Sequence, residues 1–408
     1  MTEPSLLHRI MAYNKGRIPA VLAMKYKIMS QNPFSFFRGS DHLFFEDIPK
    51  DSPLLQSPKT WICGDLHLEN LGSFKGDNGL AYFDFNDFDE AALAPCLLDI
   101  TRFACSVHVG AGELGLDAKG ITAQVRGFLD HYATALQKGY IRVQEQETAT
   151  GVIRQLLRTV QNRTRKEFLA GRVEEKKKPR LVTGTGHYIP ISAHEKQRVS
   201  DAFRKTPLYK SNPGFFAIKD VAFRIAGTGS LGMERYVLLV EGHPGRTRYA
   251  LIDVKEAQAP SLLARHHFRQ PAWGSQAERI VEIQQRVQAA APALLSTMEM
   301  DGRHFVVKEL QPMEDKLNLA HFQGKVKRCN QFIGTAGAIC AWGTLRSGGR
   351  QGSATADELI AFAGRADEWK KYVADYASKY AGKVRRDYAN FKKGYETGKV
   401  TEQPLKKS

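Results

Sequence analysis

The sequence of 408 residues has few cysteines and no long apolar segment. Its five cysteines form no C-x-x-C pair, so neither metal-ligand spacing nor a disulfide framework is present. No stretch approaches the roughly 18 uninterrupted apolar residues of a membrane-spanning helix. The first residues also lack the basic and then apolar plan of a signal peptide. We therefore expect a cytoplasmic protein with reduced cysteines and no membrane partner.

Acidic residues are outnumbered: 59 Lys and Arg face 43 Asp and Glu, which gives a net charge of +16. This excess suits an anionic ligand surface, a phosphorylated substrate or nucleic acid. It is equally typical of a solvated basic exterior. No aromatic residues are interleaved with the basic runs to form a base-stacking platform, so nucleic-acid recognition is not favoured. The sequence leaves the oligomeric state open.

Two polar motifs lie close together in the first quarter of the chain. Residues 64–70 read G-D-x-H-x-x-N and include Asp65 and Asn70, and after thirteen intervening residues Asp84 ends an aromatic run. Phosphoryl transfer needs one carboxylate to orient a hydroxyl, and an amide with a second carboxylate to hold Mg²⁺ on the phosphates. We therefore predict that Asp65 is catalytic and that Asn70 and Asp84 bind the metal, with Asp87 as an alternative ligand.

Other residues of this region allow two interpretations each. His67 would support the catalytic loop, or it is a histidine that packs a loop. Asp99, in a predicted helix, would anchor the loop from beneath, or it caps the helix or pairs with Arg102. The whole of 64–70 also fits an ordinary turn with Asx hydrogen bonding. The acidic residues after Asp84 would then be a solvated edge.

A glycine-rich motif, G-x-G-x-x-G, occupies residues 227–232 between two strand-like runs. In a Rossmann fingerprint such glycines lead into a helix. In a kinase-like loop they cap a β-hairpin over the phosphates. Because a strand-like run follows, the second interpretation fits better. The residues assigned to the nucleotide phosphates are Gly227, Gly229, Ser230 and Gly232.

Lys255 ends an apolar run about twenty residues after the glycines. It resembles the strand lysine of kinases that pairs with the α- and β-phosphates. The following helix offers Glu282, or else Glu278, as the ion-pair partner of this lysine. The alternatives are a snorkelling edge-strand lysine and a glutamate on an exposed helix face.

The motifs resemble the catalytic and metal loops of the aminoglycoside-phosphotransferase and protein-kinase-like superfamily, but their order differs. In that superfamily the glycine hairpin and the lysine precede the catalytic loop, so the resemblance implies a circular permutation. The implied fold is α+β, with a small antiparallel β lobe and a large helical lobe. The expected division is a catalytic-loop part of the helical lobe (1–150), a helical and basic linker (151–214), a β-rich nucleotide-binding lobe (215–312) and a helical completion of the large lobe (313–408).

The chain as a whole also resembles a mainly bacterial family, domain of unknown function 2252. The segments that carry this resemblance are 33–39, 63–72, 83–90, 99–102, 227–232 and 254–257. The family name implies no activity. Taken with the motifs, the sequence predicts an ATP- and Mg²⁺-dependent phosphotransferase that acts on an unknown hydroxyl acceptor, and the basic charge suits an anionic or phosphorylated one. Alternatives are a non-catalytic nucleotide-binding module and a nucleotidyl transferase of the same fold.

Overall fold

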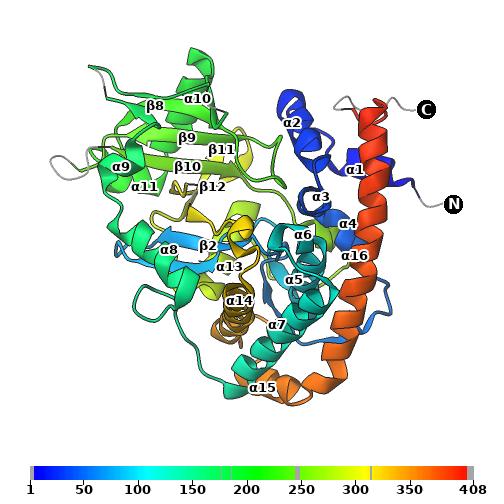
Figure 1. Cartoon of the computed structure of the whole chain (residues 1–408). Helices are drawn as coiled ribbons and strands as arrows, with labels where there is room; N and C mark the ends of the chain where they lie inside the picture. Colours follow the sequence, from blue (N-terminus) through cyan, green and yellow to red (C-terminus); the bar gives the residue numbers. More distant parts are fainter. Residues whose placement is uncertain (1–3, 176, 185, 244–248, 313–314, 402–408) are drawn as a thin grey trace.

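The computed structural model describes residues 4–401, with the exception of 176, 185, 244–248 and 313–314. The protein is a mixed α+β structure, as predicted. An antiparallel six-stranded sheet lies at one end of the molecule, and a body of helices lies at the other (Figure 1). None of the helices in the described part of the chain has the length and apolarity needed to cross a membrane.

The six-stranded sheet is built around β10, which pairs with β9 on one side and β12 on the other. Side chains alternate between the faces of a strand, so Ile252 and Val254 enter one apolar core and Leu251 enters another. Asp253 and Lys255 therefore share the face of Leu251. In spatial order the strands are β11 (Ser296–Met300), β12 (Arg303–Glu309), β10 (Ala250–Glu256), β9 (Arg235–Val240), β8 (Ile218–Arg224) and β7 (Tyr188–Ile189).

Two helices cover this sheet, and each begins with a serine cap. In α10 (Ala193–Arg204) the side chain of Ser192 accepts a hydrogen bond from Glu195 N, and in α13 (Gln276–Val287) Ser275 accepts one from Glu278 N. The first helix contacts β8 and β11, and the second contacts β11 and β12. The short helix α11 (Pro207–Ser211) follows α10, whereas α12 (Ser261–Arg265) packs on α4 (Asp41–Glu46) and enters the core of the helical body through Leu262.

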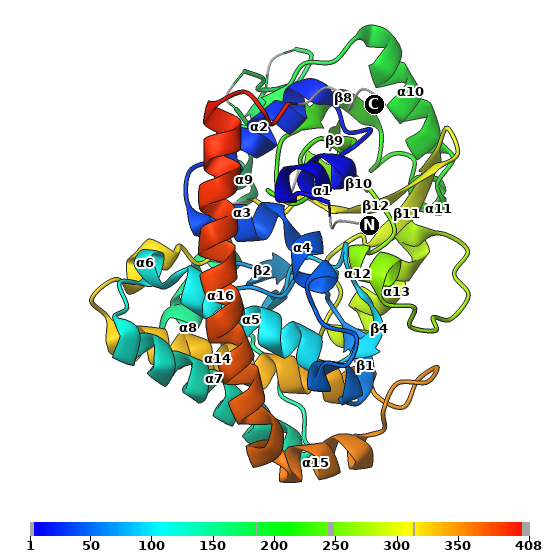
Figure 2. The same ribbon diagram turned by 90° about the vertical axis from the view of Figure 1, so that its right-hand side faces the viewer.

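The helical body is organised around α5, whose side chains are buried almost throughout. The long helix α16 runs beside α5, and α14 packs closely on α7 (Figure 2). The N-terminal helices lie between α16 and the large sheet (Figure 1). The helices of the body are α1 (Leu6–Tyr13), α2 (Pro19–Met29), α3 (Pro33–Gly39), α4 (Asp41–Glu46), α5 (Leu97–Val109), α6 (Ala111–Leu114), α7 (Ala118–Lys138), α14 (Val326–Ser347), α15 (Ala356–Gly364) and α16 (Ala366–Glu396), with 3₁₀ turns at Pro53–Gln56 and Leu319–Phe322.

Two small hairpin-like pairs flank residues 64–70. One pairs β1 (Lys59–Ile62) with β4 (Ala92–Pro95), and the other pairs β2 (Leu71–Lys75) with β3 (Ala81–Phe85). Residues 64–70 connect β1 to β2. The loop is therefore held by a strand of a different pair at each end.

Residues 151–214, predicted as a linker, are distributed over both parts of the molecule. The helix α8 (Gly151–Asn162) packs on β2 and β3 through Ile153, Leu157 and Val160, which form one apolar stripe. Further along, β7 joins the large sheet and α10 covers it. The other elements of the segment are α9 (Arg165–Leu169), β5 (Val173–Glu174) and β6 (Arg180–Leu181).

The close contact of α14 with α7 predicts opposite effects for two glycine substitutions. A Cβ at Gly337 would overlap the main-chain carbonyl of Phe128 in α7, so Gly337→Ala should lower the free energy of unfolding by about 1–3 kcal/mol. In α16, a Cβ at Gly382 has room, and Gly382→Ala should raise that free energy by about 0.5–1 kcal/mol. Urea unfolding followed by circular dichroism measures both. Equal stabilities of the two variants would contradict this account of the helix packing.

Candidate active site

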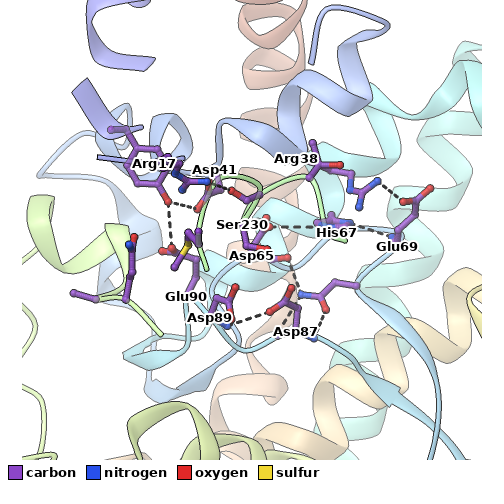
Figure 3. A pocket seen from close by; sticks show the side chains of 18 of the residues that line it. Arg17, Arg38, Asp41, Asp65, His67, Glu69, Asp87, Asp89, Glu90 and Ser230 are labelled. Carbon is purple, nitrogen blue, oxygen red and sulfur yellow. Dashed lines mark hydrogen bonds and ion pairs between the residues drawn. The ribbon is translucent and has the colours of Figure 1, made fainter. Parts of the chain in front are cut away.

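The two motif regions that the sequence singled out meet in space. Residues of 64–70 and of 227–230 line one cleft, whose empty space, including the part open to solvent, is about 850 Å³ (Figure 3). A second hollow of about 1090 Å³ adjoins it and shares Asp87 and Asp89 among its lining residues. Lys255 lies in this second hollow. The predicted residues that line one or both are Asp65, His67, Asn70, Asp87, Gly227, Gly229, Ser230 and Lys255. The predicted Gly232 is not among the described residues that line the cleft or the hollow beside it.

The start of the loop at residues 64–70 is fixed by Asp99, in the first turn of α5. Its carboxylate accepts hydrogen bonds from the backbone N–H of Cys63 at 2.8 Å and of Gly64 at 3.0 Å. Burial raises the pKa of Asp99 to about 6, and the two N–H groups oppose this rise. The anchoring role predicted for Asp99 is confirmed, and the guanidinium of Arg102 binds Asp65 instead.

Asp65 is held at one oxygen and open at the other. Its Oδ1 accepts a hydrogen bond from Arg102 Nε at 2.7 Å, and the side chain of Arg102 is completely buried. The Oδ2 atom lies 3.8 Å from His67 Nε2. About a fifth of the Asp65 side chain, 21%, is exposed. Burial raises the pKa of Asp65 to about 7, Arg102 opposes this, and the nearby Asp41 adds to it.

His67 has the supporting position that the sequence suggested. Its Nδ1 accepts a hydrogen bond from the backbone N–H of Glu69 at 3.1 Å, so the ring proton is on Nε2, which faces Asp65. Burial lowers the pKa of His67 well below its ordinary value, and Arg38 and Arg102 lower it further. The imidazole is therefore neutral and shapes the loop without adding charge.

Asn70 joins the loop to the acidic motif and does not present a free ligand atom. Its Nδ2 donates to the carbonyl oxygen of Asp65 at 2.9 Å, and its Oδ1 accepts from Asp87 N at 2.8 Å and Asn86 N at 3.3 Å. The amide oxygen already has two donors. The structure thus gives Asn70 a bracing role in place of the predicted metal contact.

Asp84 lies behind the cleft and is not among the described residues that line it. Its Oδ1 accepts from Phe85 N at 2.9 Å, and its Oδ2 accepts from Ala289 N at 3.0 Å. The side chain of Asp84 on β3 points toward α13 and α14: Ala289 follows the end of α13, and Arg346 Nη1, on α14, lies 4.0 Å from Asp84 Oδ2. Asp87, beyond the end of the strand, lines both hollows.

Lys255 bridges two carboxylates. Its Nζ lies 3.2 Å from both oxygens of Asp87 and also contacts Asp89. The predicted partner Glu282 instead binds Arg286, one turn along α13. The pairing differs from the prediction because Arg286, four residues after Glu282 on the same helix, forms an ion pair with this glutamate. The sequence analysis did not assign Asp89 to the site. The feature that could have indicated it is its position two residues after Asp87.

The glycine-rich loop is fastened to the N-terminal segment. Arg17 Nη1 donates to the carbonyl oxygens of Gly229 at 2.6 Å and Leu231 at 2.8 Å, and Lys25 Nζ donates to Gly229 O at 2.7 Å. In a trans peptide the N–H points opposite to the C=O, so Ser230 N–H is directed away from these cations. Sequence reasoning missed Arg17 and Lys25, because only the fold brings them to the loop.

The end of the cleft beside Asp65 carries further carboxylates. Glu90 accepts hydrogen bonds from Ser261 N at 2.5 Å and Ser261 Oγ at 2.7 Å, and its other oxygen lies 3.5 Å from Tyr13 Oη. The same hydroxyl is 3.5 Å from Asp41 Oδ2. Burial raises the pKa of Glu90 to about 8, and Asp41 raises it further. At this end of the cleft (Figure 3) the carboxylates can therefore accept hydrogen bonds from a ligand or be protonated themselves.

Gly64 and Gly79 provide a matched test of the loop geometry. Both have a positive φ, +85° and +76°, so alanine is strained at either position by about 1–2 kcal/mol. At Gly64 a Cβ would also overlap the main-chain carbonyl of Glu90, whereas at Gly79 it meets nothing. We expect Gly64→Ala to lower the free energy of unfolding by about 2–5 kcal/mol and Gly79→Ala by only the smaller amount. Chemical denaturation of both variants measures the difference, and similar losses would show that the contact with Glu90 does not constrain the loop.

Comparison with known proteins places the chain in a family. No curated protein and no solved structure matches it. A family model does match, over residues 17–394, and its description is "Uncharacterized protein conserved in bacteria (DUF2252)". Because the match spans most of the chain and both sides of the cleft, the protein belongs to the domain of unknown function 2252 family.

Proposed function

We propose that the protein is an ATP- and Mg²⁺-dependent phosphotransferase with a kinase-like arrangement of parts. The observation that carries the proposal is the meeting of Asp65, Asp87, Lys255 and the glycine-rich loop around adjoining hollows. These are the groups that phosphoryl transfer requires: a carboxylate for the hydroxyl, a carboxylate for the metal, and donors for the phosphates. They come from distant parts of the sequence, so local folding preference does not explain their meeting.

The acidic pair fits a magnesium ion. Mg²⁺ in phosphate-transferring sites is typically bound by one or two carboxylates together with substrate phosphates. Asp87 and Asp89 already hold a cationic group, the ammonium of Lys255. These two side chains would hold the metal, which when bound neutralises charge on the transferred phosphoryl group.

The lysine and the glycine-rich loop fit the phosphates of the donor. Lys255 would exchange its carboxylate partners for phosphate oxygens once a metal satisfies Asp87 and Asp89. Gly227 and Gly229 present no Cβ, so backbone N–H groups such as that of Ser230 can approach phosphate oxygens closely. Because Arg17 and Lys25 bind the carbonyls of the loop, these donors are oriented before the ligand arrives.

Asp65 would receive the acceptor hydroxyl at its open Oδ2. The hydroxyl proton passes to this carboxylate, the hydroxyl oxygen forms the new bond to the γ-phosphorus, and the bond from that phosphorus to the bridging oxygen breaks as ADP leaves. Arg102 keeps Asp65 in place by binding Oδ1. The buried, neutral His67 limits the movement of Asp65 on the other side.

The order of the motifs supports a circular permutation of the kinase-like chain. The glycine loop and Lys255 lie on β8–β10, and the catalytic loop that would follow them in a kinase lies between β1 and β2. Rotating the sequence restores the kinase order while the contacts remain. The cleft supports the permutation because it brings the two motif regions together, whichever of them comes first in the sequence.

The direct test is incubation of the full chain with Mg²⁺ and ATP labelled in either the α- or the γ-phosphate, in the presence of cell metabolites, followed by mass spectrometry. We expect γ-label to appear in an acceptor. Appearance of the α-label would indicate a nucleotidyl transferase. Nucleotide binding without any labelled product from an extract that supports other kinases would indicate a binding module.

Asp87 and Asp84 offer a matched pair for the metal assignment. Each change to asparagine removes one charge and preserves size, but only Asp87 lines the cleft. We expect Asp87→Asn to weaken Mg²⁺–ATP binding about tenfold or more, the equivalent of one charge-assisted interaction. Asp84→Asn should lower stability and leave the affinity nearly unchanged. Calorimetric titration of the folded variants decides the point, and the opposite ranking would return the metal to Asp84.

The pKa of Asp65 predicts the pH dependence of turnover. The carboxylate accepts a proton only when ionised, and its pKa is raised to about 7, so kcat should increase as the pH rises through that value. Asp65→Asn should lower kcat by roughly 10²-fold or more and remove this limb of the profile. Steady-state rates between pH 5.5 and 8.5 measure both effects. Full activity of Asp65→Asn would exclude the role of proton acceptor.

A further inference from the structure

A single buried arginine joins the helix α13 to two segments of the cleft. Arg279 lies in the first turn of α13, and only 1% of the residue is exposed. Its Nη2 donates to the carbonyl oxygens of Asp89 and Gln258, each at 2.8 Å, and its Nη1 donates to that of Ala91. Arg279 is not among the described residues that line the cleft or the second hollow, so any effect on a ligand passes through these partners.

The guanidinium of Arg279 is bound by carbonyl groups and not by carboxylates. Among the described residues, no carboxylate forms an ion pair with it, and its remaining acceptor is Gln276 Oε1, 2.7 Å from Nε. A buried cation without an opposite charge is unfavourable by several kcal/mol unless hydrogen bonds satisfy it. Because the acceptors belong to three separate segments, the arginine is satisfied only while all three keep their relative positions.

The acidic pair of the proposed metal site, Asp87 and Asp89, is therefore held at both ends. At one end Asn70 Oδ1 accepts from Asp87 N at 2.8 Å, and at the other end Arg279 binds the carbonyl oxygens of Asp89 and Ala91. The two aspartates are only two residues apart, so the separation of their carboxylates depends on the main chain between these contacts. Groups that orient metal ligands without binding the metal commonly change its affinity by about 10- to 100-fold.

Gln258 extends the same contact toward Lys255. It lies three residues after Lys255, in the connection from β10 to α12. The same connection leads to Ser261, whose N and Oγ both donate to Glu90, in the segment that Arg279 binds. The end of β10 is thus tied to the acidic segment both by Ser261 and by Arg279. The arginine thereby fixes the strand end that carries the proposed phosphate-binding lysine relative to the acidic pair.

We infer that Arg279 is a positioning residue of the proposed metal site: it fixes the main chain of Asp89 so that both aspartates can bind one Mg²⁺ ion. This inference rests on the proposed function, since it concerns the metal of the same site. The positive charge of Arg279 by itself repels a metal ion, so its removal would strengthen metal binding if charge alone mattered. A lysine keeps the charge but cannot replace the planar guanidinium at three segments.

The test is titration of the full chain with Mn²⁺–ATP, followed by the relaxation rate of water protons, which rises when Mn²⁺ is immobilised on a protein. Mn²⁺ prefers the same oxygen ligands as Mg²⁺. We expect Arg279→Lys and Arg279→Met each to weaken this binding about tenfold. Arg286→Lys and Arg286→Met are the matched controls and should leave it unchanged, because Arg286 lies on the same helix but binds Glu282 and lines neither hollow.

A double variant distinguishes positioning from a general loss of structure. If Arg279 acts through the carboxylate of Asp89, Arg279→Lys should have little further effect on Mn²⁺–ATP binding once Asp89→Asn has removed that charge. Losses that add in full would contradict the inference. Circular dichroism confirms that each variant is folded. Should the Arg279 variants not fold, Gln276→Leu removes only the acceptor of Nε and should weaken binding by a smaller factor, and unchanged binding would then overturn the inference.

The outcomes also separate this inference from the proposed function. If the Arg279 variants bind Mn²⁺–ATP like the Arg286 variants, or if Arg279→Met binds it more tightly than the wild type, the inference fails and the phosphotransferase remains. If the folded wild-type chain does not bind Mn²⁺–ATP, the inference and the proposed metal site both fail.

Discussion

The contact of Lys255 with Asp87 and Asp89 determines how the two halves of the cleft meet. Lys255 belongs to the central strand of the large sheet, and the two aspartates follow the small hairpin of β2 and β3, which begins where the loop at residues 64–70 ends. A buried ammonium without partners is unfavourable by several kcal/mol, so the sheet and the loop are each incomplete without the other. Asn70 extends the constraint, because it ties the backbone of Asp87 to that of Asp65. The separation between Asp65 and Lys255 is thereby set by a continuous chain of contacts.

Charge is divided unequally along the cleft, and the division follows from which element supplies each wall. The sheet contributes Arg224, Arg235 and Lys308 to the second hollow, whereas α4 contributes Asp41, and the connection from β3 to β4 contributes Glu90, to the end beside Asp65. Asp65 lies at the acidic end and Asp87 at the boundary. In a site of low dielectric such a gradient orients a ligand that has a polyanionic end. The net charge of +16 alone did not reveal this arrangement, because it does not distinguish the exterior from the cleft.

Although it left Asp99 open between a loop anchor, a helix cap and a pair with Arg102, the sequence was sufficient to predict the α+β class, the hairpin that carries the glycines and the strand that ends near Lys255. These features depend on local pattern and short spacing. The choice between Asp84 and Asp87 was not predictable, because it depends on where β3 ends, and a shift of one residue reverses the direction of a strand side chain. The partner of Lys255 depends on the rotation of α13 and on Arg286, which captures Glu282. The sequence did not indicate that Arg17 and Lys25 belong to the site, since their partners on the glycine loop lie about 200 residues away in the chain.

The N-terminal segment fixes the conformation of the glycine-rich loop before a ligand binds. Without protein partners, the carbonyl groups of the glycine-rich loop would have to bind water or turn into the cleft. In either case the N–H groups on the other side of the same peptides would lose their fixed direction. Arg17 and Lys25 bind these carbonyls, and Ile18 N donates to Gly232 O at 2.7 Å. The loop is then ordered in the folded protein, and less conformational entropy is lost when a ligand binds. The same segment brings Tyr13 to the carboxylates at the opposite end, so one stretch of chain spans both walls. Although this stretch carries none of the proposed chemistry, its position determines the shape of the space in which that chemistry would occur.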